Sequence, residues 1–179
     1  MNLVKGARKL KAMDIASLEE IKRVKYRYLR CVDLKRWDEL EDALAPDATA
    51  QYGTPSGGGP LRFTGRDAIV DFLRNTLGPG IITVHSAGQP EIEIDGDTAE
   101  GTWSFEDTVL ATEHNHTMIK GAAFYEDRYT RGADGVWRIQ HTGYTRTYEY
   151  LVPLGDLPGF KLTANRWTED APSTSLTGR

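Results

Sequence analysis

The stretch SLEEIKRVKYRYLRCVDLKRWDELEDALAP, residues 17–46, predicts two helices at the start of the fold. Ser17 and Glu20 have the spacing of a capping box, in which both side chains satisfy free backbone N–H groups at a helix start. Behind them, apolar residues recur at helical spacing and form one stripe: Leu18, Ile21, Val24, Tyr28 and Val32. A second, short helix carries Trp37, Leu40 and Leu44 and ends before Pro46.

The pattern changes further along the chain. Asp67–Leu77 has the spacing of a third helix, and Gly53–Pro60 has the composition of a loop. Extended segments separated by turn residues then follow: Ile81–Ser86, Glu91–Ile94, Thr98–Leu110, Thr117–Thr130 and Gly135–Tyr150. Helices followed by a run of antiparallel strands are typical of the α+β class. We expect one domain over residues 14–150, with a loose leader (1–13) before it and an extension (151–179) after it.

The bulk composition excludes several classes of protein. The 179 residues suit one domain with a sizeable core. A net charge of −4 and a pI near 5.6 argue against nucleic acid as a partner. No apolar run approaches the roughly 20 residues of a membrane span, and the leader lacks the apolar stretch of a secretory signal. Cys31 is the only cysteine, so no internal disulfide can form, and we expect a cytoplasmic protein.

Metal and cofactor motifs are missing from the sequence. It contains no P-loop, GxGxxG or CxxC motif, and its four histidines do not have the spacing of a metal site. His114 and His116 flank a turn among polar residues, where a solvated hairpin tip is favoured over a pair of metal ligands. We therefore expect neither a metal nor a cofactor.

Asp107 is a polar residue at an apolar position. In Thr98–Leu110 the odd positions are mostly apolar and the even positions are polar. Because side chains alternate between the two faces of a strand, Asp107 should share the inner face with Trp103 and Phe105. A carboxylate at such a position must be paired, hydrogen-bonded or part of a polar region in a cavity.

Asp33, Tyr28 and His85 each have a structural and a functional explanation. Asp33 lies at or just past the carboxyl end of the first helix, where the helix dipole disfavours an anion. It is either a turn residue balanced by Lys35 and Arg36 or a functional group. Tyr28 is either a core tyrosine or a hydrogen-bond donor in a site. His85 ends an apolar strand, and a carboxylate that reached it would fix its tautomer for proton transfer.

Five stretches carry a family resemblance: LEEIKRVKYRYLRCVDLKRWDELEDALAPD (18–47), VHSAGQPEIEI (84–94), GTWSFED (101–107), GAAFYEDRY (121–129) and DGVWRIQHTGYTRTYEY (134–150). They contain the specific combination of Tyr28, Asp33, His85, Asp107 and Arg146. Over most of residues 18–150 the chain resembles the bacterial bile-acid 7α-dehydratases. These belong to the SnoaL-like branch of the nuclear-transport-factor-2 superfamily, which also includes scytalone dehydratase, a dehydrochlorinase of lindane breakdown and ketosteroid isomerase.

The resemblance implies a cone-shaped NTF2-like (cystatin-like) fold, with a bent antiparallel sheet wrapped around three helices and a deep apolar cavity. It also implies a cofactor-independent lyase that removes water from a small hydrophobic substrate, either a steroid or a bile acid, free or as a coenzyme A thioester. A homo-oligomer is implied, with a trimer favoured. The loop Gly53–Leu61 and the tail from Leu151 differ from the bile-acid enzymes at the expected cavity mouth. The substrate therefore stays open between a bile acid, another steroid, an aromatic polyketide and a xenobiotic.

The roles implied by the resemblance follow a β-elimination. His85 is the base, Asp33 holds it, and Tyr28 donates a hydrogen bond to the substrate carbonyl. Asp107 and Arg146 orient the substrate or the dyad, although Arg146 can also be explained as a surface arginine of the sheet.

Tyr52 is placed in the cavity from its strand position alone. Two alternatives remain: an isomerase, cyclase or dehydrohalogenase on the same scaffold, and a non-catalytic protein that binds a hydrophobic ligand.

Overall fold

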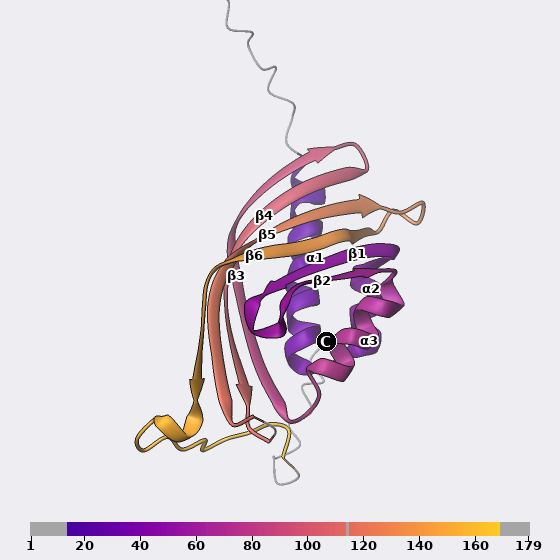
Figure 1. The fold of residues 1–179 in the computed structure, drawn as a ribbon. Helices are drawn as coiled ribbons and strands as arrows, with labels where there is room; N and C mark the ends of the chain where they lie inside the picture. The colour runs from indigo at the N-terminus through magenta and orange to yellow at the C-terminus, as the bar shows by residue number, and fades with distance from the viewer. Residues whose placement is uncertain (1–13, 114, 169–179) are drawn as a thin grey trace, which may run out of the picture.

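Helix α1 (Ile15–Leu34) lies along the inner side of a strongly bent sheet, and two shorter helices lie beside it (Figure 1). The computed structural model describes residues 14–113 and 115–168. The predicted leader (1–13), His114 and residues 169–179 of the predicted extension lie outside this part. In the two described ranges, no helix is both long and apolar enough to cross a membrane.

The α+β class and the three predicted helices are confirmed. The remaining elements are α2 Trp37–Ala43, β1 Leu44–Thr54, β2 Gly59–Thr64, α3 Arg66–Thr76, β3 Ile81–Asp95, β4 Thr98–Ala111, β5 Thr117–Arg131 and β6 Trp137–Pro153, with 3₁₀ turns η1 at Pro55–Gly57 and η2 at Leu154–Asp156.

The six strands form one mixed sheet in the order β2-β1-β6-β5-β4-β3. Every neighbouring pair is antiparallel except β1 and β6, which run parallel. The expectation of a purely antiparallel sheet is therefore wrong at this pair. Parallel neighbours need a long connection between them, and here α3 and the four strands β2 to β5 provide it.

The sequence places Tyr52 on a strand but does not define β1 and β2, and it treats Gly53–Pro60 as a loop. In the structure β1 runs to Thr54, and β2 starts again at Gly59. Strand β1 contains Pro, Asp, Ala and Gly, which are rare in strands, so its hydrogen bonds to β6 and β2 outweigh a weak local preference. At Gly53 a Cβ would overlap the carbonyl oxygen of Tyr144, so this strand can pair with β6 only with glycine there.

Asp14, rather than Ser17, caps α1. The Asp14 carboxylate accepts hydrogen bonds from the Ser17 backbone N–H at 3.0 Å and from the Ser17 hydroxyl at 2.7 Å. The predicted capping box is therefore wrong by one turn. An aspartate is favoured at this position because its negative charge interacts favourably with the positive end of the helix dipole. Its oxygens also accept hydrogen bonds from backbone N–H groups that have no partner in the helix.

A fully buried ion pair joins α1 to β5. The Lys25 Nζ lies 2.7 Å from Asp127 Oδ2, and both side chains are 0 % exposed. The Tyr129 hydroxyl donates to Asp127 at 2.8 Å and accepts the Trp103 indole N–H at 2.9 Å. Burial lowers the pKa of Lys25, and the neighbouring Asp127 carboxylate opposes that shift. The ion pair between Lys25 and Asp127 thus holds α1 against the sheet, and each of the two buried charges needs the other as its partner.

We expect Lys25→Met to lower the free energy of unfolding by about 3–5 kcal/mol, because it leaves the Asp127 charge buried without a partner. Urea denaturation measures this change. The control is Lys22→Met, one turn away, which removes a partly exposed pair with Glu19 and should have little measurable effect. Equal effects of the two substitutions would show that the buried pair does not stabilise the docking of α1.

Candidate active site

A cavity of about 500 Å³ lies between the helices and the inner face of the sheet. Five of the six predicted site residues line it: Tyr28, Tyr52, His85, Asp107 and Arg146. The sixth, Asp33, lies behind His85. The rest of the wall is largely apolar and aromatic, with α3 contributing Phe72, whose ring stacks on Tyr52 at 5.9 Å between centroids. Such a wall with a few convergent polar groups suits a small hydrophobic ligand.

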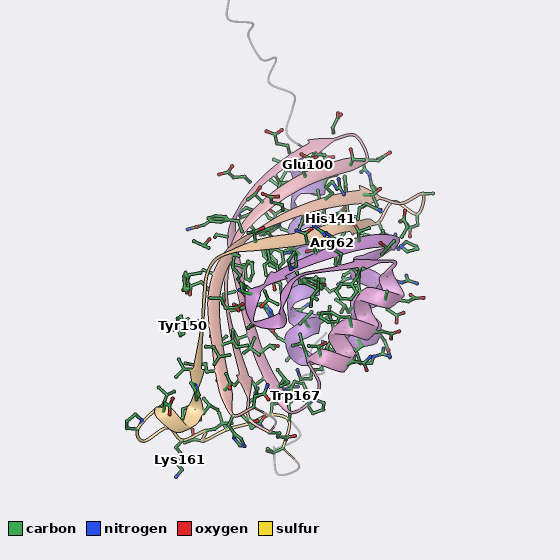
Figure 2. The ribbon with its side chains drawn as sticks, viewed as in Figure 1. Arg62, Glu100, His141, Tyr150, Lys161 and Trp167 are labelled. Atoms are coloured by element: carbon green, nitrogen blue, oxygen red, sulfur yellow. The ribbon has the colours of Figure 1, made fainter. Side chains whose placement is uncertain are left out.

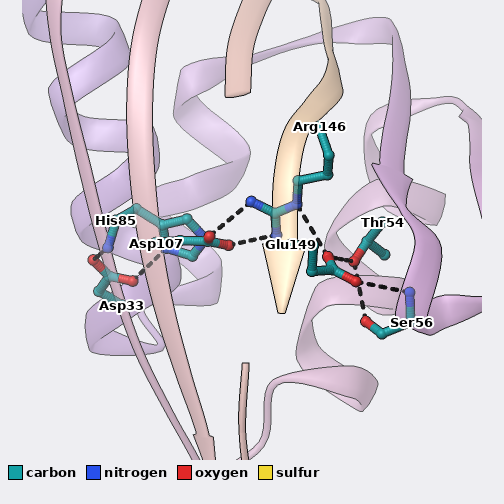
Figure 3. A network of polar contacts seen from close by, with 7 residues as sticks. All are labelled: Asp33, Thr54, Ser56, His85, Asp107, Arg146 and Glu149. Carbon is teal, nitrogen blue, oxygen red and sulfur yellow. Dashed lines mark hydrogen bonds and ion pairs between the residues drawn. The ribbon is translucent and has the colours of Figure 1, made fainter. Parts of the chain in front are cut away.

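Asp33 holds His85 through both carboxylate oxygens (Figure 3). Its Oδ1 lies 2.7 Å from Nδ1 of the imidazole, and its Oδ2 accepts the His85 backbone N–H at 2.8 Å. The Thr83 hydroxyl donates to Oδ1 at 2.8 Å. Because Nδ1 is bound to the carboxylate, Nε2 is the ring nitrogen left for a ligand. The structure therefore brings together two residues that lie far apart in the sequence.

The end of α1 points Asp33 toward β3. Lys35 has a left-handed backbone with φ 57°, which ends the helix, and the Arg36 N–H then donates to the Cys31 carbonyl at 2.8 Å. The helix dipole disfavours an anion here, but three donors from β3 compensate for it. Arg36 instead lies 3.4 Å from Glu39. The polar contacts of Asp33 are thus with the cavity wall.

Tyr28 and Tyr52 share a hydrogen bond, with their hydroxyl oxygens 2.8 Å apart. Both rings are buried, and burial raises the pKa of each hydroxyl above its ordinary value. Both phenols therefore stay protonated. In such a pair one hydroxyl donates to the other, and the proton of the acceptor is free to point into the cavity.

Arg146 connects Asp107 in the cavity wall to Glu149, which binds the 3₁₀ turn η1 (Figure 3). Its Nη1 and Nη2 donate to Asp107 at 2.7 and 2.8 Å, and its Nε donates to Glu149 at 3.1 Å. Glu149 also accepts the Thr54 hydroxyl at 2.7 Å and the Ser56 N–H at 2.8 Å. Burial raises the Glu149 pKa, but these hydrogen bonds and the Arg146 charge lower it by more. The cluster thus fixes η1 over the cavity.

The structure shows on which face of the sheet Asp107 of β4 and Arg146 of β6 lie. Asp107 is 5 % exposed and lies on the inner face, as the alternation predicts. The Arg146 side chain is 6 % exposed, so the explanation as a surface arginine is wrong.

Two local features make the Arg146 cluster possible. The register between β5 and β6 shifts beside Arg146, so Arg146 and Glu149 share the inner face while Tyr148 points outward. Gly121 lies between Asp107 on β4 and Glu149 on β6. A Cβ at Gly121 would lie 2.9 Å from Arg146 Nη1, so the guanidinium reaches Asp107 through space that glycine leaves open.

Sequence reasoning missed Glu149 and Lys25. Regular alternation from Arg146 assigns Glu149 to the outer face, and only the bulge turns it inward. Lys25 did give a signal, because it interrupts the apolar stripe between Ile21 and Tyr28. A lysine at a stripe position indicates a buried partner.

Proton transfer and hydrogen bonding are the chemistry that these side chains offer. In residues 14–113 and 115–168, no three His, Cys, Asp or Glu side chains are grouped so that they could hold a metal ion.

Comparison with known families assigns the domain. A model of the SnoaL-like domain matches residues 13–143. The chain belongs to this family. The SnoaL-like part of the predicted resemblance is thereby confirmed. An uncharacterized protein of Mycobacterium tuberculosis is 28% identical over 145 residues, which cover 80% of this chain and 94% of that protein.

Solved structures share the SnoaL-like fold at low sequence identity. A hexachlorocyclohexane dehydrochlorinase from Novosphingobium barchaimii has a TM-score of 0.67 and 22% identity, and covers 84% of this chain and 96% of its own. A candidate scytalone dehydratase from Novosphingobium aromaticivorans has a TM-score of 0.66 and 18% identity. The match covers 76% of this chain and 87% of that chain. The likeness places this chain on a scaffold whose members include elimination enzymes.

We expect Gly121→Ala to lower the free energy of unfolding by about 1–3 kcal/mol, because the added methyl group crowds Arg146 and the Tyr148 carbonyl. Urea denaturation measures the change. Gly88→Ala on β3 is the matched control, since a Cβ there would meet nothing within 4 Å. If both variants unfold at the same urea concentration, the open space at Gly121 is not needed by the Arg146 cluster.

Proposed function

We propose that this SnoaL-like protein is a cofactor-independent dehydratase, a lyase that removes water from a hydroxylated hydrophobic substrate conjugated to a carbonyl group. A steroid or a bile-acid-like molecule is the substrate class that we favour. The observation that supports the proposal most is the 2.7 Å contact between Asp33 and the imidazole of His85, a residue that lines a largely apolar cavity. A protein that only binds a ligand has no need of such an acid–base pair.

In the proposed reaction His85 removes a proton from a carbon next to the conjugated carbonyl system. The Nε2 takes the proton while Asp33 holds Nδ1 and stabilises the positive charge on the ring. The C–H electron pair moves into the conjugated system. It then forms the new double bond as the C–O bond breaks. The protonated His85 returns its proton to the departing hydroxyl, which leaves as water.

Tyr28 stabilises the charge that builds on the carbonyl oxygen during proton removal. Its hydroxyl is protonated and bound to Tyr52, which fixes its direction before the substrate arrives. A donor that is oriented in advance in a cavity with little water contributes strongly to such a step. Conjugation in the substrate makes the proton acidic enough for an imidazole to remove it.

The Arg146 cluster bears on the kind of substrate. Arg146 is bound by Asp107 and Glu149 together, so it offers no unpaired positive charge to an anionic ligand. Two carboxylates on one guanidinium leave this part of the wall negative. An uncharged polar group, such as a hydroxyl or a carbonyl, fits here better than a free carboxylate.

A dehydrohalogenation is the second candidate, and the fold shared with a hexachlorocyclohexane dehydrochlorinase favours it. The same base would remove the proton, and chloride would leave in place of water. An isomerase would return the proton to the substrate and release nothing. Mass spectrometry of the product from a hydroxylated 3-oxo-Δ4 steroid separates these reactions, because only dehydration lowers the mass by one water.

We expect His85→Ala and Asp33→Asn each to abolish most of the turnover of a hydroxylated 3-oxo-Δ4 steroid, because the base or its orientation is lost. Steady-state kinetics measures kcat. His141→Ala is the control for His85→Ala, because His141 binds Thr49 away from the cavity. Asp38→Asn is the control for Asp33→Asn, because the Asp38 side chain is fully exposed. Turnover near wild type in the His85 and Asp33 variants would rule out the dyad as the acid–base group.

We expect Tyr28→Phe to lower kcat by about 10²–10³, the loss typical of one oxyanion donor. The ring stays in place, so the fold should be kept, and circular dichroism checks this. Tyr26→Phe on the same helix is the control, because Tyr26 is 47% exposed. An unchanged kcat would reduce Tyr28 to a residue of the core.

A further inference from the structure

A row of tyrosines crosses the inner face of the sheet. Tyr52 on β1 is the register partner of Tyr144 on β6, and Tyr144 is in turn the partner of Tyr125 on β5. Tyr28 approaches this row from α1 and binds Tyr52. All four residues line the cavity. Four phenols therefore border one space, and the proposed reaction has so far used only one of them as a donor.

Contacts with three side chains hold the Tyr125 ring in one orientation. Its ring stacks on Phe105 with centroids 4.2 Å apart and meets Tyr144 edge-on at 5.3 Å. The Lys25 Nζ lies over its face, 3.2 Å from the centroid. Because Asp127 fixes Lys25 from the other side, the ring has contacts that leave it little freedom to turn.

The Tyr125 hydroxyl, by contrast, makes no hydrogen bond to any residue of the described chain. The residue is only 2 % exposed, and buried phenol hydroxyls normally have a partner. Since Tyr125 lines the cavity, a polar group of a ligand bound in the cavity can complete its hydrogen bonding. Burial raises the pKa of this hydroxyl well above its ordinary value, so it is protonated and can donate.

We propose that the Tyr125 hydroxyl donates a hydrogen bond to the carbonyl oxygen of the bound ligand and is the second donor beside Tyr28. The inference deepens the proposed function and rests on its assignment of the cavity as the ligand site. Two converging donors are a common way to stabilise an oxygen on which negative charge develops.

Lys25 acts on both donors as a positioning residue. Its ammonium lies 3.2 Å from the Tyr125 ring and 5.3 Å from the Tyr28 ring. The contact orients the Tyr125 ring, whereas burial and the paired Asp127 carboxylate, which offsets the ammonium charge, raise the pKa of both phenols. The ligand that this arrangement recognises is an uncharged carbonyl compound with an apolar skeleton.

The test measures binding rather than turnover. Androst-4-en-3-one carries the carbonyl group but has no hydroxyl to lose, and androst-4-ene is the same skeleton without the oxygen. Quenching of tryptophan fluorescence gives the Kd of each ligand for the wild type, for Tyr125→Phe and for Tyr150→Phe. Tyr150 is the control, because it is 44% exposed and lies on the outer side of the sheet (Figure 2).

We expect the wild type and the Tyr150 variant to prefer the ketone. Tyr125→Phe should lose about 3- to 10-fold in affinity for the ketone, the size of one hydrogen bond, and nothing for the hydrocarbon. Equal losses for both ligands would mean that the residue only packs, and no loss for either would mean that its hydroxyl is not used. A wild type without a preference for the ketone would also overturn the inference.

The result stands apart from that of the proposed reaction. A protein that binds the ketone through Tyr125 but never releases water from a hydroxylated steroid keeps this inference and loses the dehydratase. A protein that dehydrates such a steroid, with Tyr125→Phe binding the ketone as the wild type does, keeps the dehydratase and loses this inference.

Discussion

The hydrogen bonds of Asp33 to β3 are the interaction on which the candidate site depends. One carboxylate binds the His85 ring, the His85 backbone and the Thr83 hydroxyl, so it joins the end of α1 to the sheet and orients the imidazole at once. A carboxylate at a helix C-terminus is unfavourable by itself, and the three donors make the position stable. The same contacts that close the helix onto the sheet therefore prepare the ring for proton transfer.

Irregular backbone positions place the polar groups as much as regular elements do. The left-handed Lys35 ends α1 just after Asp33. A bulge in β6 turns Glu149 to the same side as Arg146, and Gly121 leaves room for the guanidinium. A regular strand would leave either Arg146 or Glu149 facing solvent. The bulge and the glycine gather charges that simple alternation would keep apart.

The SnoaL-like scaffold supports several reactions, so local chemistry must carry the functional argument. The solved structures named above share the fold at 18% and 22% identity, a level at which substrates do not transfer. Within this chain the polar groups divide into two sets. Asp33 and His85 supply acid–base chemistry, whereas the tyrosines of the inner face supply neutral donors. The Arg146 cluster binds η1 through Glu149 and keeps no free positive charge for an anion.

The sequence by itself determined the α+β class, three helices, the long strands and the inward position of Asp107, because these depend on local periodicity. It also carried the family resemblance that joined Tyr28, Asp33, His85, Asp107 and Arg146 into one candidate site. The tertiary structure alone decided that β1 pairs parallel with β6 and that Glu149 faces inward. It also decided that Lys25 lies over the ring of Tyr125. Those features arise from pairing and packing between distant segments, and the periodicity of a single segment does not specify which distant segment it meets or where a bulge falls.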